Sequence, residues 1–117
     1  MNSRLEIPHP LPTALTELIA ARFRLLAEPM RIRILDSLRE EAASVGELAE
    51  MLETTQQNVS KHLATLHRAG IVAREKDGNR VRYSIADPAV FELCEHVCGG
   101  LRRQVHELDE LIPGGRR

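Results

Sequence analysis

Aromatic residues are the scarcest class in this 117-residue chain, at 3% of its residues with no tryptophan. The hydrophobic core must therefore be aliphatic, which suits packed helices rich in leucine, isoleucine, valine and alanine. Hydrophobic residues make up 43% of the chain and charged residues 28%, which is an ordinary globular balance. The length predicts one domain, and a domain this small is helped by burying more surface against a partner subunit.

Long apolar runs and cysteines are also scarce. No run approaches the roughly 20 apolar residues that a membrane-spanning helix needs, and residues 1–14 lack the apolar stretch of a secretory signal. We therefore expect a cytoplasmic protein with no membrane partner. Two cysteines are too few for a disulfide framework, and in a reducing compartment they are free thiols.

The features of an enzyme are missing as well. The sequence contains no glycine-rich phosphate loop, no serine, histidine and aspartate arrangement with supporting context, and no metal-ligand cluster. We therefore do not expect catalysis. A non-catalytic interaction module is the class of protein that this leaves.

Charge is balanced overall but unevenly distributed along the chain. The net charge is −1, yet residues 37–53 hold one positive and five negative side chains, and residues 54–86 hold six positive and two negative. Two ordinary solvated faces would explain this pattern, and so would a local basic surface for phosphates. The motifs decide between these explanations.

Apolar residues at helical spacing predict four helices in the first 70 residues. We place them at 12–27, at 29–40, from residue 45 and from residue 56. Glu28-Pro29 separates the first two, because the residue before a proline avoids the helical region. Ser44 and Glu47 form a capping-box pattern before the third helix, and Thr55 suits the N-cap of the fourth. Gly70 ends the fourth helix in the left-handed conformation.

The hydrophobic period changes after residue 70. Two short strand-like runs, 71–75 and 80–85, flank the turn signal Lys76-Asp77-Gly78-Asn79 and predict a β-hairpin. A fifth predicted helix covers 88–112.

The order of elements predicts the fold class. A short helix, a tight turn, a second helix and a hairpin form the winged helix-turn-helix arrangement, here with five helices and a two-stranded wing in a mainly α chain. We expect residues 1–11 to form a flexible arm, 12–112 to form the domain and 113–117 to form a tail.

The fourth predicted helix opens with polar side chains suited to reading DNA. In a helix-turn-helix protein, the first residues of the second helix reach base edges in the major groove. Glutamine and asparagine pair bidentately with adenine, serine pairs with several bases, and lysine binds guanine or phosphate. The candidates are Gln56, Gln57, Asn58, Ser60, Lys61 and His62. A polar turn that only caps the helix is the alternative, and the basic hairpin downstream favours DNA binding.

Basic residues of the hairpin are the second set of candidates. Lys76, Arg80 and Arg82 would contact phosphate or enter the minor groove. Each one, taken alone, is explained equally well as a solvated charge on a strand.

Three stretches of the chain resemble the ArsR/SmtB family of winged helix-turn-helix repressors. They are Leu26-Ala27-Glu28-Pro29-Met30-Arg31-Ile32-Arg33-Ile34-Leu35, Asn58-Val59-Ser60-Lys61-His62-Leu63 through Val72, and residues 78–83. The resemblance covers about residues 15–112. It implies a homodimer joined by the first and fifth helices, and repression through binding of a double-stranded operator. It also implies release by an inducer, which in that family is often a metal ion.

The metal sites of that family are not matched here residue by residue. A third-helix site needs a Cys-x-Cys pair, whereas this sequence has Glu47-Leu48-Ala49-Glu50-Met51. The fifth-helix zinc site is matched at Asp87, but Ala89, Gly100 and Arg103 occupy the other ligand positions. Residues outside the matching register are His96, His106 and Asp109. No cofactor is therefore certain.

Cys94 and Cys98 lie four residues apart on the fifth predicted helix and share one face. Packing in the dimer interface is one explanation, because a free cysteine behaves as a small buried hydrophobe. The other is a thiol site for a thiophilic metal or metalloid ion, completed by two thiols of the partner. A disulfide within the helix is disfavoured, because its Cβ atoms would be about 5–6 Å apart rather than about 3.8 Å.

Overall fold

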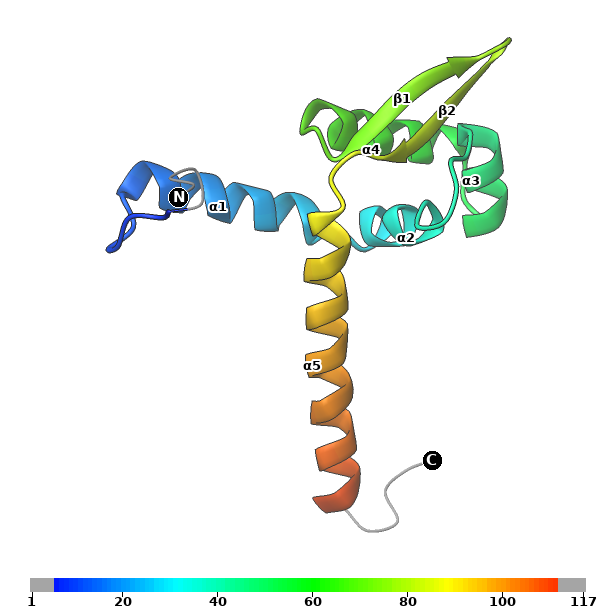
Figure 1. Cartoon of the computed structure of the whole chain (residues 1–117). Helices are drawn as coiled ribbons and strands as arrows, with labels where there is room; N and C mark the ends of the chain where they lie inside the picture. The colour runs from blue at the N-terminus through cyan, green and yellow to red at the C-terminus, as the bar shows by residue number, and fades with distance from the viewer. Residues whose placement is uncertain (1–5, 112–117) are drawn as a thin grey trace.

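The computed structural model describes residues 6–111, which form five helices and one two-stranded antiparallel sheet (Figure 1). The elements are α1 (Thr13–Leu26), α2 (Pro29–Ser37), α3 (Val45–Leu52), α4 (Gln56–Arg68), β1 (Val72–Asp77), β2 (Arg80–Ile85) and α5 (Ala89–Leu111). The predicted fold class and order of elements are confirmed. Residues 6–11 of the predicted arm contain no helix or strand, whereas residues 1–5 and the predicted tail lie outside the described residues.

Local capping signals set most of the helix starts. The Ser44 side chain accepts a hydrogen bond from the Glu47 backbone nitrogen at 3.2 Å, and the Glu47 side chain accepts one from the Ser44 nitrogen at 2.9 Å, so the capping box is confirmed. Gly70 follows Ala69, the C-cap of α4, and has a φ of 78°, as expected for a left-handed helix stop. α2 ends at Ser37 rather than near residue 40; Leu38 is still buried in the core, and the charged residues after it are exposed.

The core is aliphatic and lies where α2, α3 and α4 meet the base of the hairpin. Its largest fully buried side chains are Ile34, Leu35, Leu48, Leu63, Leu66, Ile71, Val59 and Val72. None of these is aromatic, in agreement with the composition.

The hairpin is anchored to the helices at its base and free at its tip. Val72 pairs with Ile85 and Asp77 with Arg80, which leaves a two-residue turn, shorter than the predicted four-residue one. Gly78 in that turn has a φ of 67°, a conformation that costs glycine little. The Tyr83 backbone exchanges two hydrogen bonds with Ala43, of 2.8 and 3.0 Å, so the segment before α3 extends the sheet.

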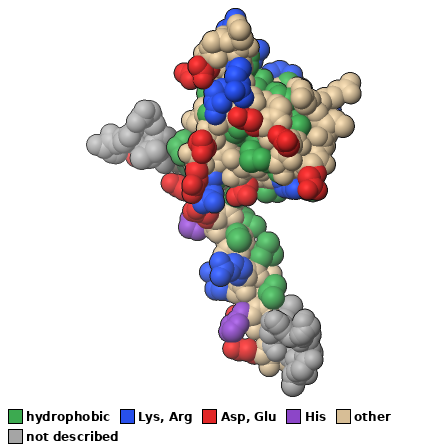
Figure 2. All heavy atoms as spheres, turned by 90° about the vertical axis from the view of Figure 1, so that its right-hand side faces the viewer, with side chains coloured by type: hydrophobic (Ala, Val, Ile, Leu, Met, Phe, Trp, Pro, Cys, Tyr) green, Lys and Arg blue, Asp and Glu red, His purple; other side chains and the backbone are tan. Residues whose placement is uncertain are grey.

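Two helices extend away from the core, as Figure 1 shows for α1 and α5. The radius of gyration is 17.9 Å, whereas a compact domain of this length has one of about 13 Å. Large apolar side chains on these helices are between 37% and 75% exposed: Leu18, Ile19, Phe23, Val97, Leu101, Val105 and Leu111. Figure 2 shows hydrophobic side chains along one side of the α5 stalk. Within residues 6–111, no helix combines the length and the apolar character needed to cross a membrane.

Candidate nucleic-acid interface

The helix-turn-helix unit consists of α3 and α4, joined by three residues. Glu53 adopts a left-handed φ of 55° and ends α3. Thr55 then caps α4, because its hydroxyl accepts a hydrogen bond from the Asn58 backbone nitrogen at 3.0 Å. This turn fixes the direction of α4, which we call the recognition helix, relative to α3.

The recognition helix separates an apolar face from a polar one. Val59, Leu63 and Leu66 are fully buried. Four of the six predicted base-reading residues lie exposed on the first turns: Gln56, Gln57, Ser60 and Lys61. Since one face is held by the core, the exposed face is presented in a fixed orientation, as base recognition requires.

Asn58 has a more restricted position than the other candidates. It is half-buried, and its Nδ2 donates to the Thr54 hydroxyl at 3.1 Å. The side chain thus holds the turn between α3 and α4, and its second Nδ2 hydrogen and its carbonyl oxygen are left for other hydrogen bonds.

His62 does not lie on the exposed face of α4. It is 6% exposed, its Nδ1 accepts a hydrogen bond from Arg31 Nε at 3.1 Å, and its Nε2 lies 3.8 Å from Glu28 Oε1. A side chain on the core face of a helix cannot reach a base edge, so the prediction that His62 contacts DNA is wrong. The periodicity contained this signal, because His62 follows Val59 by three residues and precedes Leu66 by four.

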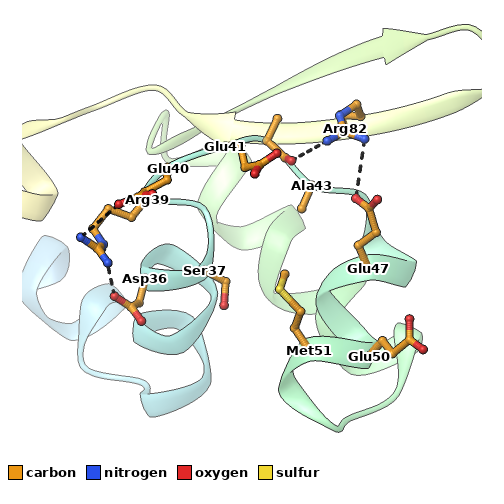
Figure 3. A pocket seen from close by; sticks show the side chains of 11 residues that line it. Asp36, Ser37, Arg39, Glu40, Glu41, Ala43, Glu47, Glu50, Met51 and Arg82 are labelled. Atoms are coloured by element: carbon orange, nitrogen blue, oxygen red, sulfur yellow. Dashed lines mark hydrogen bonds and ion pairs between the residues drawn. The ribbon is translucent and has the colours of Figure 1, made fainter.

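The basic residues of the hairpin differ in the exposure of their side chains. Lys76 and Arg80 are exposed near the tip. Arg82 is mostly covered: its Nη2 donates to the Ala42 carbonyl at 2.6 Å, and its Nη1 lies 3.6 Å from Glu47 Oε1. Figure 3 shows Arg82 pointing from β2 toward Glu47 on α3. Arg82 therefore anchors the hairpin to α3 and to the segment before it, and its contact with phosphate stays a prediction.

Glu47 is the residue whose importance sequence reasoning underestimated. Besides capping α3, its Oε2 accepts a hydrogen bond from Arg80 Nη2 at 3.2 Å. The hydrogen bond from the Ser44 backbone, followed by the charges of Arg82 and Arg80, holds the pKa of Glu47 below its usual value. The only signal in the sequence was the opposite charge of the α3 region and the hairpin.

An open pocket of about 630 Å³ lies between α2, α3 and the base of the hairpin (Figure 3). Five carboxylates line it: Asp36, Glu40, Glu41, Glu47 and Glu50. Arg39 pairs with two of them, at 3.7 Å from Asp36 and 3.8 Å from Glu40. Because this lining is mostly acidic, it repels a phosphate backbone.

The two cysteines differ in exposure. Cys94 is half-buried against the core, and burial raises the pKa of its thiol, whereas Cys98 is exposed. Both line an open groove of about 660 Å³ between α2 and α5, together with Arg33, Arg39 and Arg102. In the part of the chain that the structure describes, no three His, Cys, Asp or Glu side chains are grouped to hold one metal ion.

Comparison with known proteins identifies the family. A helix-turn-helix domain family matches residues 26–75. The uncharacterized HTH-type transcriptional regulator Rv0081 of Mycobacterium tuberculosis is 42% identical over 106 residues, which cover 86% of this chain and 93% of that protein. The HTH-type transcriptional repressor SmtB of the same organism is 40% identical over 80 residues, which cover 68% of this chain and 59% of SmtB. This chain belongs to the ArsR/SmtB family of transcriptional regulators.

Solved structures have a similar fold. The crystal structure of Rv0081 from M. tuberculosis matches with a TM-score of 0.75 at 41% identity, over 82% of this chain and 97% of that one. Reduced HlyU from Vibrio cholerae matches with a TM-score of 0.65 at 31% identity, over 72% of this chain and 88% of that one. The resemblance drawn from the sequence motifs is therefore confirmed. The ArsR/SmtB family is one of transcription regulators rather than enzymes.

Proposed function

We propose that this ArsR/SmtB protein is a homodimeric repressor that reads an operator with the exposed face of α4 and contacts phosphates with the β1–β2 hairpin. The observation that carries the proposal is the polar first half of α4, which is held against the core by fully buried Val59, Leu63 and Leu66. Gln57 and Lys61 lie four residues apart on that exposed face, so both can enter one major groove.

The homodimer is supported by the uncovered apolar faces of α1 and α5. Val97, Leu101 and Val105 recur along α5 at intervals of four residues and are all more than half exposed. A contiguous apolar face on two projecting helices is more than a stable monomer usually leaves in water. A second copy, related by a two-fold axis, would cover it and place two α4 helices at half-sites one helical turn apart.

The proposed DNA partner also indicates where the protein acts. Operator DNA lies in the compartment of the chromosome, so we propose a cytoplasmic location.

A salt series tests DNA binding directly. Fluorescence anisotropy with a selected operator and with random duplex DNA should show affinity that falls steeply as salt rises, because each phosphate contact releases counterions. Replacing Lys76→Ala should weaken both DNAs alike and reduce the salt slope by about one. Glu41→Gln is the control, since Glu41 lines the acidic pocket and not the proposed interface. An affinity that does not change with salt or with DNA sequence would instead indicate an interaction module whose partner is not DNA.

A second candidate role is inducer sensing through Cys94 and Cys98. Its support is that both cysteines line one groove and that Cys98 is exposed, so that its thiol is accessible to an ion. Two thiols are too few to close a tetrahedral thiolate site, so a soft ion would need ligands from the partner or from solvent. The packing explanation is supported for Cys94, which contacts the core.

A further inference from the structure

One side chain of α2 joins the recognition helix to α1. Arg31 Nε donates to His62 Nδ1 on α4 at 3.1 Å, and Arg31 Nη1 donates to the carbonyl oxygen of Leu25 at 2.8 Å. Leu25 lies in the last turn of α1, the helix whose outer face we assign to the dimer interface. Arg31 therefore bonds two helices besides its own.

Arginine is suited to this double contact. The last carbonyls of a helix have no partner within the helix, and a guanidinium can satisfy one of them. Its planar fork holds several N–H groups in fixed directions, so two acceptors on different helices are bound at once. A lysine ammonium presents a single point of charge and cannot reproduce this geometry.

Glu28 holds the opposite edge of the His62 ring. Glu28 Oε1 lies 3.8 Å from His62 Nε2 and accepts a hydrogen bond from the Met30 backbone nitrogen at 2.8 Å, which fixes it as the N-cap of α2. Because Nδ1 accepts a hydrogen bond from Arg31, the proton of the neutral ring is on Nε2, facing the carboxylate. His62 is thus oriented from both edges by the start of α2.

We propose that Arg31 and His62 are positioning residues for operator binding, which set α4 against α1 and so couple the recognition helix to the dimer interface. The proposal rests on the proposed function, because the quantity it controls is operator affinity. Neither residue touches DNA: His62 is buried, and Arg31 is turned inward to His62 and Leu25.

The contact depends on a neutral His62. A second proton on the ring would be placed at Nδ1, where Arg31 already donates, so two donors would face each other and the bond would break. The charged groups around the ring are Glu28 and Arg31 of α2 and Lys61 of α4. Burial lowers the pKa of His62, and Arg31 and Lys61 act in the same direction against Glu28. The contact is therefore intact at neutral pH and is lost as the pH falls well below 6.5.

The test is operator affinity between pH 5 and 8, measured by fluorescence anisotropy on wild type and three variants. His62→Asn places an acceptor oxygen near the position of Nδ1 without a titrating group. Arg31→Lys keeps the charge but not the fork, and His67→Asn is the control because His67 is exposed on the same helix. Thermal unfolding followed by circular dichroism at each pH confirms that the measured protein is folded.

We expect wild-type affinity to fall about tenfold toward pH 5, as for loss of one charge-assisted hydrogen bond. His62→Asn should bind like wild type at pH 7.5 and lose little affinity at pH 5, whereas His67→Asn should follow wild type. Arg31→Lys should bind about tenfold more weakly at pH 7.5 with an unchanged salt slope, since no phosphate contact is removed. A merely structural role would leave the pH profile of the folded protein unmoved.

Two results would overturn the proposal: a pH profile of His62→Asn that is parallel to that of wild type, or wild-type affinity in folded Arg31→Lys. If Arg31→Lys does not fold, the His62→Asn profile still decides, because that variant keeps the acceptor. Failure of the proposed function looks different, since wild type itself would then show no preference for any operator at pH 7.5.

Discussion

Arg82 Nη1 of β2 lies 3.6 Å from Glu47 Oε1 of α3. This ion pair connects the β1–β2 hairpin, the wing of the fold, to the first helix of the helix-turn-helix unit. The same carboxylate accepts a hydrogen bond from Arg80, which lies nearer the tip of the hairpin. Glu47 thereby joins the wing to α3 and partly neutralises Arg80, which we propose contacts phosphate.

Glu47→Gln should raise the affinity for random DNA while lowering thermal stability. The charge that neutralises Arg80 is lost, so the salt slope of DNA binding should increase, by up to about one. Glu50→Gln is the matched control, because Glu50 is exposed on the same helix and lines the same pocket. Equal effects of the two substitutions on the salt slope would show that only overall charge matters.

Leu101→Glu should convert the dimer into a monomer and abolish operator binding at micromolar concentration. Leu101 is 56% exposed on the apolar side of α5, and a carboxylate there would be buried without a partner in the dimer. Met51→Glu is the control, since Met51 is 55% exposed on α3. Sedimentation velocity decides: a wild-type monomer, or a Leu101→Glu dimer, contradicts the assigned interface.

Cys94→Ser and Cys98→Ser should differ in stability. A hydroxyl at position 94 enters a partly apolar environment, so Tm should fall by on the order of 3–5 °C, whereas exposed Cys98 should tolerate serine. Differential scanning calorimetry measures both. If the pair also senses, arsenite or cadmium should release wild type from the operator, and Cys98→Ser should remain bound. Equal stability of the two variants would show that Cys94 has no packing role.

Stability should fall as the pH drops below 6.5, and His62 should contribute to the fall. Its pKa is lowered in the folded protein, so the unfolded chain takes up a proton at a higher pH than the folded one. The free energy of unfolding therefore decreases between the ordinary value of 6.5 and the lowered folded value. Urea unfolding at several pH values should give a smaller decrease for His62→Asn. An unchanged pH dependence would mean that His62 is equally protonated in both states.

Local signals predicted most of the fold. The capping box at Ser44, the N-cap at Thr55 and the glycine stop at Gly70 act within a few residues of chain, so the sequence contains their physical cause. The change of hydrophobic period likewise predicted the hairpin, whose strands are consecutive in the sequence.

Contacts between residues far apart in the sequence could not be predicted from local patterns. Arg82 and Glu47 are 35 residues apart, and only the folded chain shows that they meet. The difference in exposure between Cys94 and Cys98 depends on where α5 projects beyond the core. The sequence pattern of α5 alone does not reveal that point. The burial of His62 was predictable from its spacing to Val59 and Leu66. It was missed because histidine is polar and occurs among candidate DNA-contacting residues.

The most direct measurement is selection of binding sites from a random duplex library with wild type and with a Gln57→Ala, Ser60→Ala double variant. Both side chains are exposed on the reading face of α4. Wild type should enrich an inverted repeat with half-sites spaced by one helical turn, about 34 Å, or a multiple of it. The variant should lose preference at defined positions, by about 1–3 kcal/mol for each lost base contact. No enrichment by wild type, or identical enriched sites for both proteins, would contradict the claim that α4 reads the operator.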